Sequence, residues 1–456
     1  MSEMRVLAGF LQNRVGMNNF RIDQDRLRIS VAFFLLWPLF FQLGSGVYRD
    51  KTYIADSTAT LLWLPLPISI LACFCGVVMF WKPKSVSISL KFILVTMALM
   101  VCSYFVTSID HDGVGNTKLV LLAQYILPMF GMMLGQCYES EGMTDSTNLE
   151  KGFLYVLAVI VPLQLVSSWL QGHPYLTTHL YLFSIYQHLQ YVPVIFVAAF
   201  LVVFGRLWKQ KEYKVILLVL TPVMTLYAAA AMSMMAIAML LLGLLCMSIY
   251  WFMKFSSKLP IILLLAGMAL TWGWVQIPFE KRYSIFENKF SFVVLENGEY
   301  KGWASGTLSQ LLPKNIKERL RFWEYYAENT VTSPSNFLFG HSEPPDRTQY
   351  PSAHNYYLDV IYNFGVLALL PMLWVMYKII SMLYTFRSSV YASAGLTSLS
   401  AVVLFLLLVD NSFKVGLRQP YSGIFTFFLL GILITRLSEV STNGVSMPMI
   451  KNTLGK

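Results

Sequence analysis

The sequence is poor in charged residues and lacks the short alternating segments that build membrane β-barrels. Charged residues make up 13% of its 456 residues, about half their share in soluble domains. The sequence contains many apolar runs of about 20 residues, and a helix of this length crosses the hydrocarbon core of a bilayer. No amphipathic pattern covers these runs, as it would in a large soluble protein with buried helices. We therefore predict an all-α polytopic membrane protein.

Cysteine is scarce as well, and its placement does not indicate a metal site. The cysteines are odd in number, lack metal-ligand spacing and fall within or at the ends of apolar runs, so we interpret them as small apolar side chains. They are Cys73, Cys75, Cys102, Cys137 and Cys246. The net charge of +10 does not indicate a nucleic-acid partner, because Lys and Arg also collect in the cytoplasmic connections of membrane proteins. No cleavable signal is evident before the first apolar run.

Twelve apolar runs predict transmembrane spans. They lie near 29–47, 60–81, 91–108, 117–137, 152–170, 191–208, 214–231, 233–252, 259–278, 355–385, 393–410 and 420–436. The least certain division falls in 214–252, a single 39-residue apolar run that is too long for one crossing. We divide this run near Ala231-Met232-Ser233, because only then do the flanking basic residues of the later spans fall on the cytoplasmic side.

Basic residues predict the orientation of these spans. Five arginines precede the first run and place the N-terminus in the cytoplasm; they are Arg5, Arg14, Arg21, Arg26 and Arg28. The short connections on the same side also carry many cations: Lys82, Lys84, Lys151, Arg206, Lys209, Lys211, Lys254, Lys258 and Arg387. The short opposite connections carry fewer: Arg49, Lys51, Lys414 and Arg418. This bias favours twelve spans with both ends in the cytoplasm.

Residues 279–354 form the one long polar interval after the first predicted span, on the side opposite the cytoplasm. An interval of 76 residues with nine Lys or Arg and nine Asp or Glu is long for a connection, and such loops are often functional. Part of it has helical periodicity: Ile316 to Asn329 places Leu320, Trp323 and Ala327 on one face. Prolines flank this segment, as expected at helix ends.

Three residues in this interval suit phosphate chemistry. Arg319 and Arg321 offer guanidinium groups that bind phosphate oxygens through a bidentate fork. His354 precedes an apolar helix next to Asn355, where an imidazole can act as a general base near neutral pH. Two simpler interpretations remain open. The arginines can pair with glutamates on the same helix, and His354 can merely mark the water interface.

The pattern of these residues resembles a known family. Arg319-x-x-x-Trp323, then Pro334…Gly340, then His354-Asn355-x-Tyr357-Leu358…Gly365 is similar to the O-antigen ligase and polymerase family of bacterial envelopes. The motifs cover roughly residues 214–380, and the layout of spans and one large loop covers the whole chain.

The resemblance implies a fold and an activity. Members have a fold like the GT-C class of membrane glycosyltransferases and transfer a glycan from undecaprenyl diphosphate at the periplasmic face of the inner membrane, with no metal or other cofactor. The expected parts are a basic cytoplasmic N-terminus (1–28), transmembrane helices (29–278), a periplasmic catalytic loop (279–354), transmembrane helices (355–436) and a cytoplasmic tail (437–456). The expected partners are an undecaprenyl-diphosphate-linked oligosaccharide, membrane lipid and a chain-length regulator.

The resemblance also implies roles by position. Arg319 would hold the diphosphate leaving group, and His354 would lie beside the acceptor hydroxyl as base or positioning group. Arg321 matches the motif less well but has the right charge. Asn355, Tyr357 and Trp323 stand in the matched motifs and are expected to contact substrate.

One position departs from the family pattern. Members carry a Ser-Arg near the outer turn before the eighth span, where this chain reads Ala231-Met232-Ser233-Met234. Candidates to replace the missing arginine are Arg418, Arg347 and Arg282. The departure disfavours a ligase more than a polymerase. Asp410 and Lys414 are one helical turn apart, and we interpret them mainly as an ion pair.

Three functions remain in view. The first is a Wzy-type polysaccharide polymerase, an inverting enzyme that joins lipid-linked repeat units. The second is an O-antigen ligase, which moves the finished polymer to lipid A-core. The third is a lipid-glycan transporter, which should carry ionisable residues at mid-membrane and show related halves. The span interiors carry almost none of these, so the transporter is disfavoured.

Overall fold

The computed structural model is helical throughout the part of the chain that it describes. The described residues are 29–31, 35, 68–81, 86–108, 114–139, 147–170, 191–231, 233–255, 259–276, 314–342, 345, 349–350 and 352–445. No strand occurs among them. The prediction of an all-α protein is therefore confirmed for these residues.

Six helices are long and apolar enough to cross a membrane. They lie at Ser87–Thr107, Asn148–Val166, Lys211–Ala230, Tyr356–Thr385, Ala394–Phe413 and Tyr421–Ser441, and two shorter apolar helices lie at Val192–Leu207 and Met234–Ile249. This supports a membrane-embedded protein. The predicted span 29–47 falls mostly outside the described residues, so the total of twelve stays a prediction.

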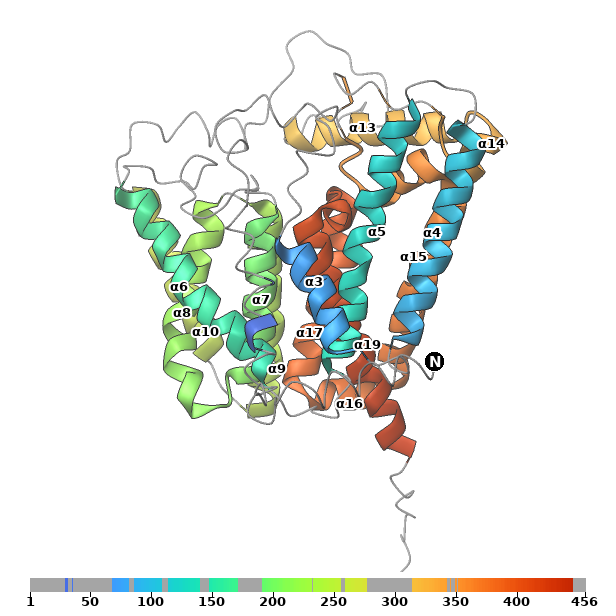
Figure 1. Cartoon of the computed structure of the whole chain (residues 1–456). Coiled ribbons are helices and arrows are strands. Elements are labelled where there is room, and N and C mark those ends of the chain that lie inside the picture. Colours follow the sequence, from blue (N-terminus) through green and yellow to red (C-terminus); the bar gives the residue numbers. More distant parts are fainter. Residues whose placement is uncertain are drawn as a thin grey trace, which may run out of the picture.

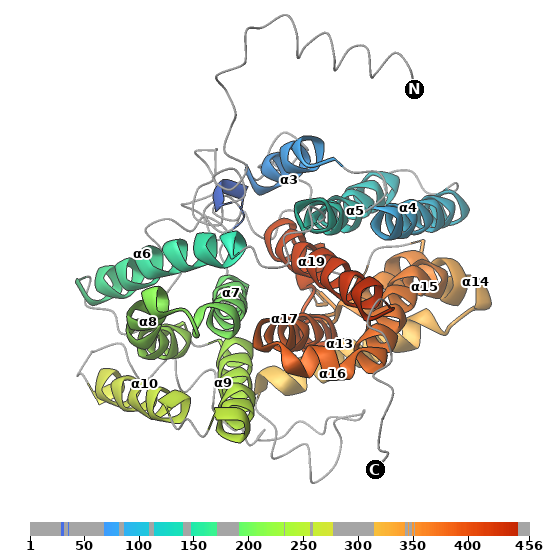
Figure 2. The same ribbon diagram turned by 90° about the horizontal axis from the view of Figure 1, so that it is seen from below.

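The helices form an upright bundle with α13 lying across one end (Figure 1). On one side stand α6 (Asn148–Leu170), α7 (Val192–Leu207), α8 (Lys211–Ala230), α9 (Met234–Phe255) and α10 (Leu259–Gln276). On the other stand α3 (Ile68–Met79), α4 (Ser87–Ser108), α5 (Val114–Glu139) and α15 (Tyr356–Thr385). Figure 2 shows α17 (Ala394–Leu404) and α19 (Pro420–Val445) between the two groups.

The apolar run at 214–252 divides into two helices, as predicted. Helix α8 ends at Ala230 and α9 begins at Met234, with Ala231 in a turn between them.

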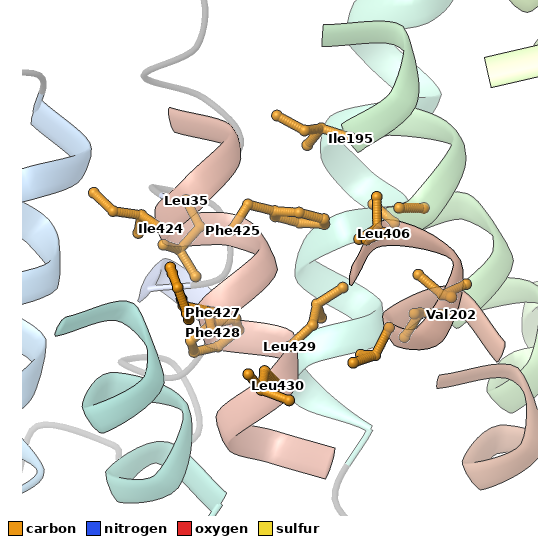
Figure 3. Close-up of a cluster of buried hydrophobic side chains, with 14 of the residues drawn as sticks. Leu35, Ile195, Val202, Leu406, Ile424, Phe425, Phe427, Phe428, Leu429 and Leu430 are labelled. Carbon is orange, nitrogen blue, oxygen red and sulfur yellow. The ribbon is translucent and has the colours of Figure 1, made fainter. Parts of the chain in front are cut away.

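Helices α5 and α19 approach closely in the middle of the bundle. A Cβ atom at Gly135 would stand 2.2 Å from the Phe428 carbonyl oxygen, and one at Gly431 would stand 2.2 Å from that of Met132. Small residues at such contacts let helix backbones meet in membranes, where dispersion and packing drive association. Figure 3 shows the buried core beside this contact, where Phe425 of α19 points toward Ile195 of α7 and toward Leu406, which follows α17. Phe428 lies on the other side of α19, and its ring is 5.5 Å from that of Tyr138 on α5.

The end of the bundle away from α13 contains a buried ionic cluster. The Arg436 guanidinium on α19 binds Glu139 of α5 at 2.8 Å and Glu150 of α6 at 3.3 Å. All three side chains are buried, so each charge depends on its partners. The cluster joins α19 to α5 and α6, which are consecutive in the chain and lie far from α19 in sequence. Helix α19 continues to Val445, nine residues beyond the predicted span end at residue 436, and the division between this span and the cytoplasmic tail stays a prediction.

Helix α13 (Lys314–Thr330) confirms the helix predicted over 316–329. A short helix not predicted from the sequence, α14 (Pro334–Phe339), follows it. Helix α15 is not continuous: Gly365 has φ 80° and ψ 168°, which interrupts the predicted 355–385 span. We call the end of the bundle covered by α13 the α13 end.

Two glycines with positive φ dock α14 against the interruption in α15. At Gly340 φ is 82°, and a Cβ at Gly365 would stand 2.0 Å from the Leu338 carbonyl oxygen. The His341 amide donates to the Tyr362 carbonyl at 2.7 Å. Only glycine accepts both the backbone angle and this proximity. The junction therefore fixes α14 against α15.

A connector between α17 and α19 completes the α13 end. It consists of one π-helical turn, η5 (Phe405–Asp410), then α18 (Asn411–Phe413) and a 3-10 turn, η6 (Gly416–Arg418). A further short helix, α16 (Arg387–Ala392), joins α15 to α17 at the opposite end of the bundle (Figure 1). Single π-helical turns occur often at functional sites.

Candidate functional site

The face of α13 that turns toward the connector carries Arg319 and Trp323. Residues four apart lie on one face of a helix. The Arg319 guanidinium Nη1 donates to the Phe413 carbonyl at 2.7 Å, and the Trp323 ring lies 5.5 Å from the Phe413 ring. Arg319 and Trp323 therefore both attach α13 to the connector at the same residue, Phe413.

The connector keeps its irregular path through side-chain hydrogen bonds. The Asn411 Oδ1 accepts from the Leu417 amide at 2.8 Å, and the Asn411 Nδ2 donates to the Leu406 carbonyl at 2.7 Å. The Ser422 hydroxyl donates to the Gly416 carbonyl at 2.6 Å. These bonds satisfy backbone groups that a regular helix would pair, and they fix the positions of Lys414 and Arg418.

Arg418 is held by a carboxylate from α15 and a phenol from α5. Its Nη1 lies 2.7 Å from the Asp359 Oδ2, and the same oxygen accepts a hydrogen bond from the Tyr125 hydroxyl. The Arg418 side chain is 16% exposed whereas Asp359 is 3% exposed, so the cation is less deeply buried than its partner. Asp359 thus orients Arg418 and keeps it charged.

Lys414 forms the predicted pair with Asp410, at 3.0 Å. Both side chains are buried, which the sequence does not indicate. Burial lowers the pKa of Lys414, and the Asp410 carboxylate opposes that change. The Lys414 ammonium also lies 5.7 Å from the centre of the Tyr191 ring, at the start of α7.

His354 lies beside these cations, just before α15. Its ring stacks on Phe322 of α13, with centroids 5.7 Å apart and planes at 21°. Burial, followed by the positive charge of Arg319, lowers the pKa of His354 to about 4. Its φ of 48° is a left-handed conformation that costs a non-glycine residue about 1–3 kcal/mol and clusters at functional sites. At neutral pH the imidazole is uncharged and able to accept a proton.

We call Arg319, Lys414 and Arg418 the cation cluster. Asp359 and Asp410 each contact one member, whereas Arg319 donates to a neutral carbonyl, so among the described residues the group carries more positive than negative charge. Burial lowers the pKa of Arg319, although guanidinium groups stay charged in proteins. Fixed cations beside a neutral imidazole can bind a polyanion and accept a proton from a nearby hydroxyl.

The structure separates Arg321 from this cluster, against the sequence prediction. Arg321 is exposed, donates to the Gln349 carbonyl at 3.4 Å and lies over the Tyr350 ring. Two residues along a helix correspond to about 200° of rotation. Arg321 therefore turns away from the face that carries Arg319.

Asn355 and Tyr357 make contacts within the protein, and their predicted substrate contacts stay predictions. The Asn355 Oδ1 accepts from the amides of Tyr357 and Leu358 at 3.0 and 3.2 Å, and so caps α15. The Tyr357 hydroxyl donates to the Leu407 carbonyl of the π-helical turn. The remaining candidates, Arg347 and Arg282, lie outside the described residues.

Sequence reasoning missed three residues that shape the site. Asp359 carried one signal, a carboxylate in the first turn of an apolar helix, which is costly unless paired. Tyr125 and Tyr191 carried none, because a tyrosine near the end of an apolar run is ordinary. No group of three or more His, Cys, Asp or Glu side chains suited to a metal ion occurs within the described ranges.

The fold and site define an all-helical membrane protein with a buried cation cluster at one end of its bundle. No family model matches the chain, and a comparison with curated proteins finds no match for it.

Proposed function

We propose that the protein is a bacterial inner-membrane polysaccharide polymerase, which transfers a glycan from undecaprenyl diphosphate to a second lipid-linked repeat unit. The observation that carries the proposal is the cation cluster beside a neutral His354. The family resemblance supplies the substrate class. The finer topology, with twelve spans, a GT-C-like fold and a periplasmic α13 end, belongs to the same proposal.

The chemical step needs stabilisation of a diphosphate leaving group. The acceptor hydroxyl oxygen forms a bond to the anomeric carbon, and the bond from that carbon to the diphosphate oxygen breaks with inversion. The electron pair leaves on the diphosphate, where Arg319 and Arg418 face the growing negative charge. Preorganised cations in a water-poor site are typically the largest contributors to such catalysis.

The proton of the acceptor hydroxyl goes to a ring nitrogen of His354. A pKa of about 4 makes the free imidazole a weak base, which is below the optimum for general base catalysis. Burial is the main cause of this low pKa, and the positive charge of Arg319 is the second. A bound diphosphate that neutralises Arg319 opposes the second cause, so His354 is a stronger base with the donor in place than without it.

Arg418 is the best supported replacement for the family arginine that is missing at Met234. Met234 is 53% exposed and apolar, and it brings no charge to the start of α9. Arg418 has a dedicated carboxylate in Asp359 and a partly exposed side chain. We assign it the role of the second diphosphate contact.

The first test is the lipopolysaccharide pattern of a strain that lacks the protein. A single repeat unit on the core supports the polymerase, because ligation still proceeds. Bare core with polymer accumulating on the lipid carrier indicates the ligase instead. An unchanged pattern contradicts both the polymerase and the ligase, and indicates that the protein acts on another glycan or is a transporter. Complementation with Arg319→Ala assigns the effect to the site.

A further inference from the structure

An apolar groove runs along α17 and the π-helical turn. Helix α9 forms its other wall, and α7 contributes to its floor through Leu201. The cavity has a volume of about 350 Å³, within the range of sites that hold a ligand. Lining residues on both walls are exposed, including Leu242 at 52% and Leu408 at 41%. The groove is therefore open along its side between α9 and α17.

The groove presents little polarity. The hydroxyls among its lining residues already donate to backbone carbonyls: Thr397 to Val390, and Ser398 to Leu201, each at 2.7 Å. The lining on the α17 side extends from Ala394 to Val409. Fifteen helical steps correspond to about 22 Å, most of the roughly 30 Å thickness of a hydrocarbon core.

One end of the groove meets the cation cluster. Val409 lines the groove, and the next residue, Asp410, binds Lys414 at 3.0 Å. Phe413, whose carbonyl accepts from Arg319, follows one turn later. The same π-helical turn therefore carries apolar side chains into the groove and leads directly into the cations. A site with this form suits an amphiphile with a polyanionic head and a long apolar tail.

We propose that this groove binds the isoprenoid tail of the lipid diphosphate donor, while the cation cluster binds its diphosphate. The choice of occupant rests on the proposed function. A tail bound in the groove tethers the donor to the protein. The diphosphate then reaches Arg319 at a high effective concentration, without a separate binding step from water. It also lets the carrier enter and leave sideways from the bilayer, through the opening between α9 and α17.

The experiment is photocrosslinking of the full chain in nanodiscs of phosphatidylethanolamine and phosphatidylglycerol. The probe is a glycan-free polyprenyl diphosphate with a diazirine in its tail, and adducts are mapped by mass spectrometry. We expect adducts on the α9 and α17 walls, and their loss when unmodified polyprenyl diphosphate competes. A diazirine phosphatidylglycerol should leave these walls largely unlabelled.

Two matched variants sharpen the test. Ala401 is an exposed lining residue, and Ala401→Phe fills the groove, so we expect about tenfold less adduct and a KM for the lipid donor raised by about tenfold. Leu245 is 49% exposed on α9 and does not line the groove, so Leu245→Phe should stay within about twofold of the parent. Circular dichroism and thermal unfolding verify that both variants fold.

The outcomes separate this proposal from the proposed function. Adducts outside the groove, equal labelling by phosphatidylglycerol, or an unchanged yield in folded Ala401→Phe would overturn the groove proposal. If glycan transfer then still requires Arg319, the proposed polymerase function holds and only the groove proposal fails. If the groove is labelled as expected but the purified protein transfers no glycan, the lipid site stands and the polymerase fails.

Discussion

Replacing Arg319 tests the site most directly, because its two effects have different magnitudes and readouts. In Arg319→Ala the Phe413 carbonyl loses a charge-assisted hydrogen bond of 2.7 Å, which should lower the free energy of unfolding by about 2 kcal/mol. Loss of one preorganised cation from the leaving group should lower kcat by about 10²- to 10³-fold. Arg319→Lys keeps the charge without the planar fork, so its kcat should lie between those of the parent and Arg319→Ala.

The assay is transfer of a fluorescent repeat unit between lipid diphosphates, with purified protein in nanodiscs. Inhibition by inorganic diphosphate reports ground-state binding, and it should weaken less than kcat falls if Arg319 acts mainly on developing charge. Arg321→Ala is the comparison: because Arg321 faces away from the cluster, its kcat should change by no more than about threefold.

Two results would refute this reasoning. A folded Arg319→Ala protein with parental kcat would remove Arg319 from the chemistry. Equal losses of kcat in Arg321→Ala and Arg319→Ala would mean that both arginines reach the diphosphate, as the sequence alone suggested. The assignment of Arg319 and Arg321 to opposite faces of α13 would then be wrong. Thermal unfolding of each variant separates either result from a general loss of fold.

Further predictions concern pH, backbone, charge and metal. Because the pKa of His354 is about 4, kcat/KM should fall only as the pH is lowered toward that value, and the corresponding fall in kcat should occur at higher pH. Both acidic falls should be absent in His354→Gln. If they persist in this variant, another group causes them. Gly365→Ala adds a Cβ 2.0 Å from the Leu338 carbonyl oxygen at φ 80° and should lower the unfolding midpoint, so an unchanged midpoint contradicts the docked α14. Arg436→Met leaves buried carboxylates without their cation and should cost about 3–5 kcal/mol of unfolding free energy, largely recovered when Glu139 and Glu150 also become Gln. EDTA should leave transfer intact, and strong inhibition reversed by Mg²⁺ would refute a metal-independent reaction.

Much of the scaffold could be predicted because its signals are local. The length of apolar runs is the signal for membrane helices, and the described helices follow the predicted runs. The division at Ala231 and the helix over Ile316 to Asn329 follow from run length and periodicity alone. Other features were not predicted because local rules do not record them: α19 continues beyond residue 436, and Arg436 lies inside the helix, paired with Glu139 of α5.

By itself the sequence determined the helical membrane architecture and the helix over Ile316 to Asn329, because both depend on the length and periodicity of apolar residues along one segment. Only the tertiary structure decided which cations meet. Arg418, Asp359 and Tyr125 come from three segments far apart in the chain, and their convergence depends on how α5, α15 and the connector pack. The same packing opened an apolar groove beside Lys414, whereas the cap at Asn355 and the rotation of about 200° between Arg319 and Arg321 are local to one helix. Contacts between helices arise from close packing at small residues and glycine junctions, which no periodicity along one helix records.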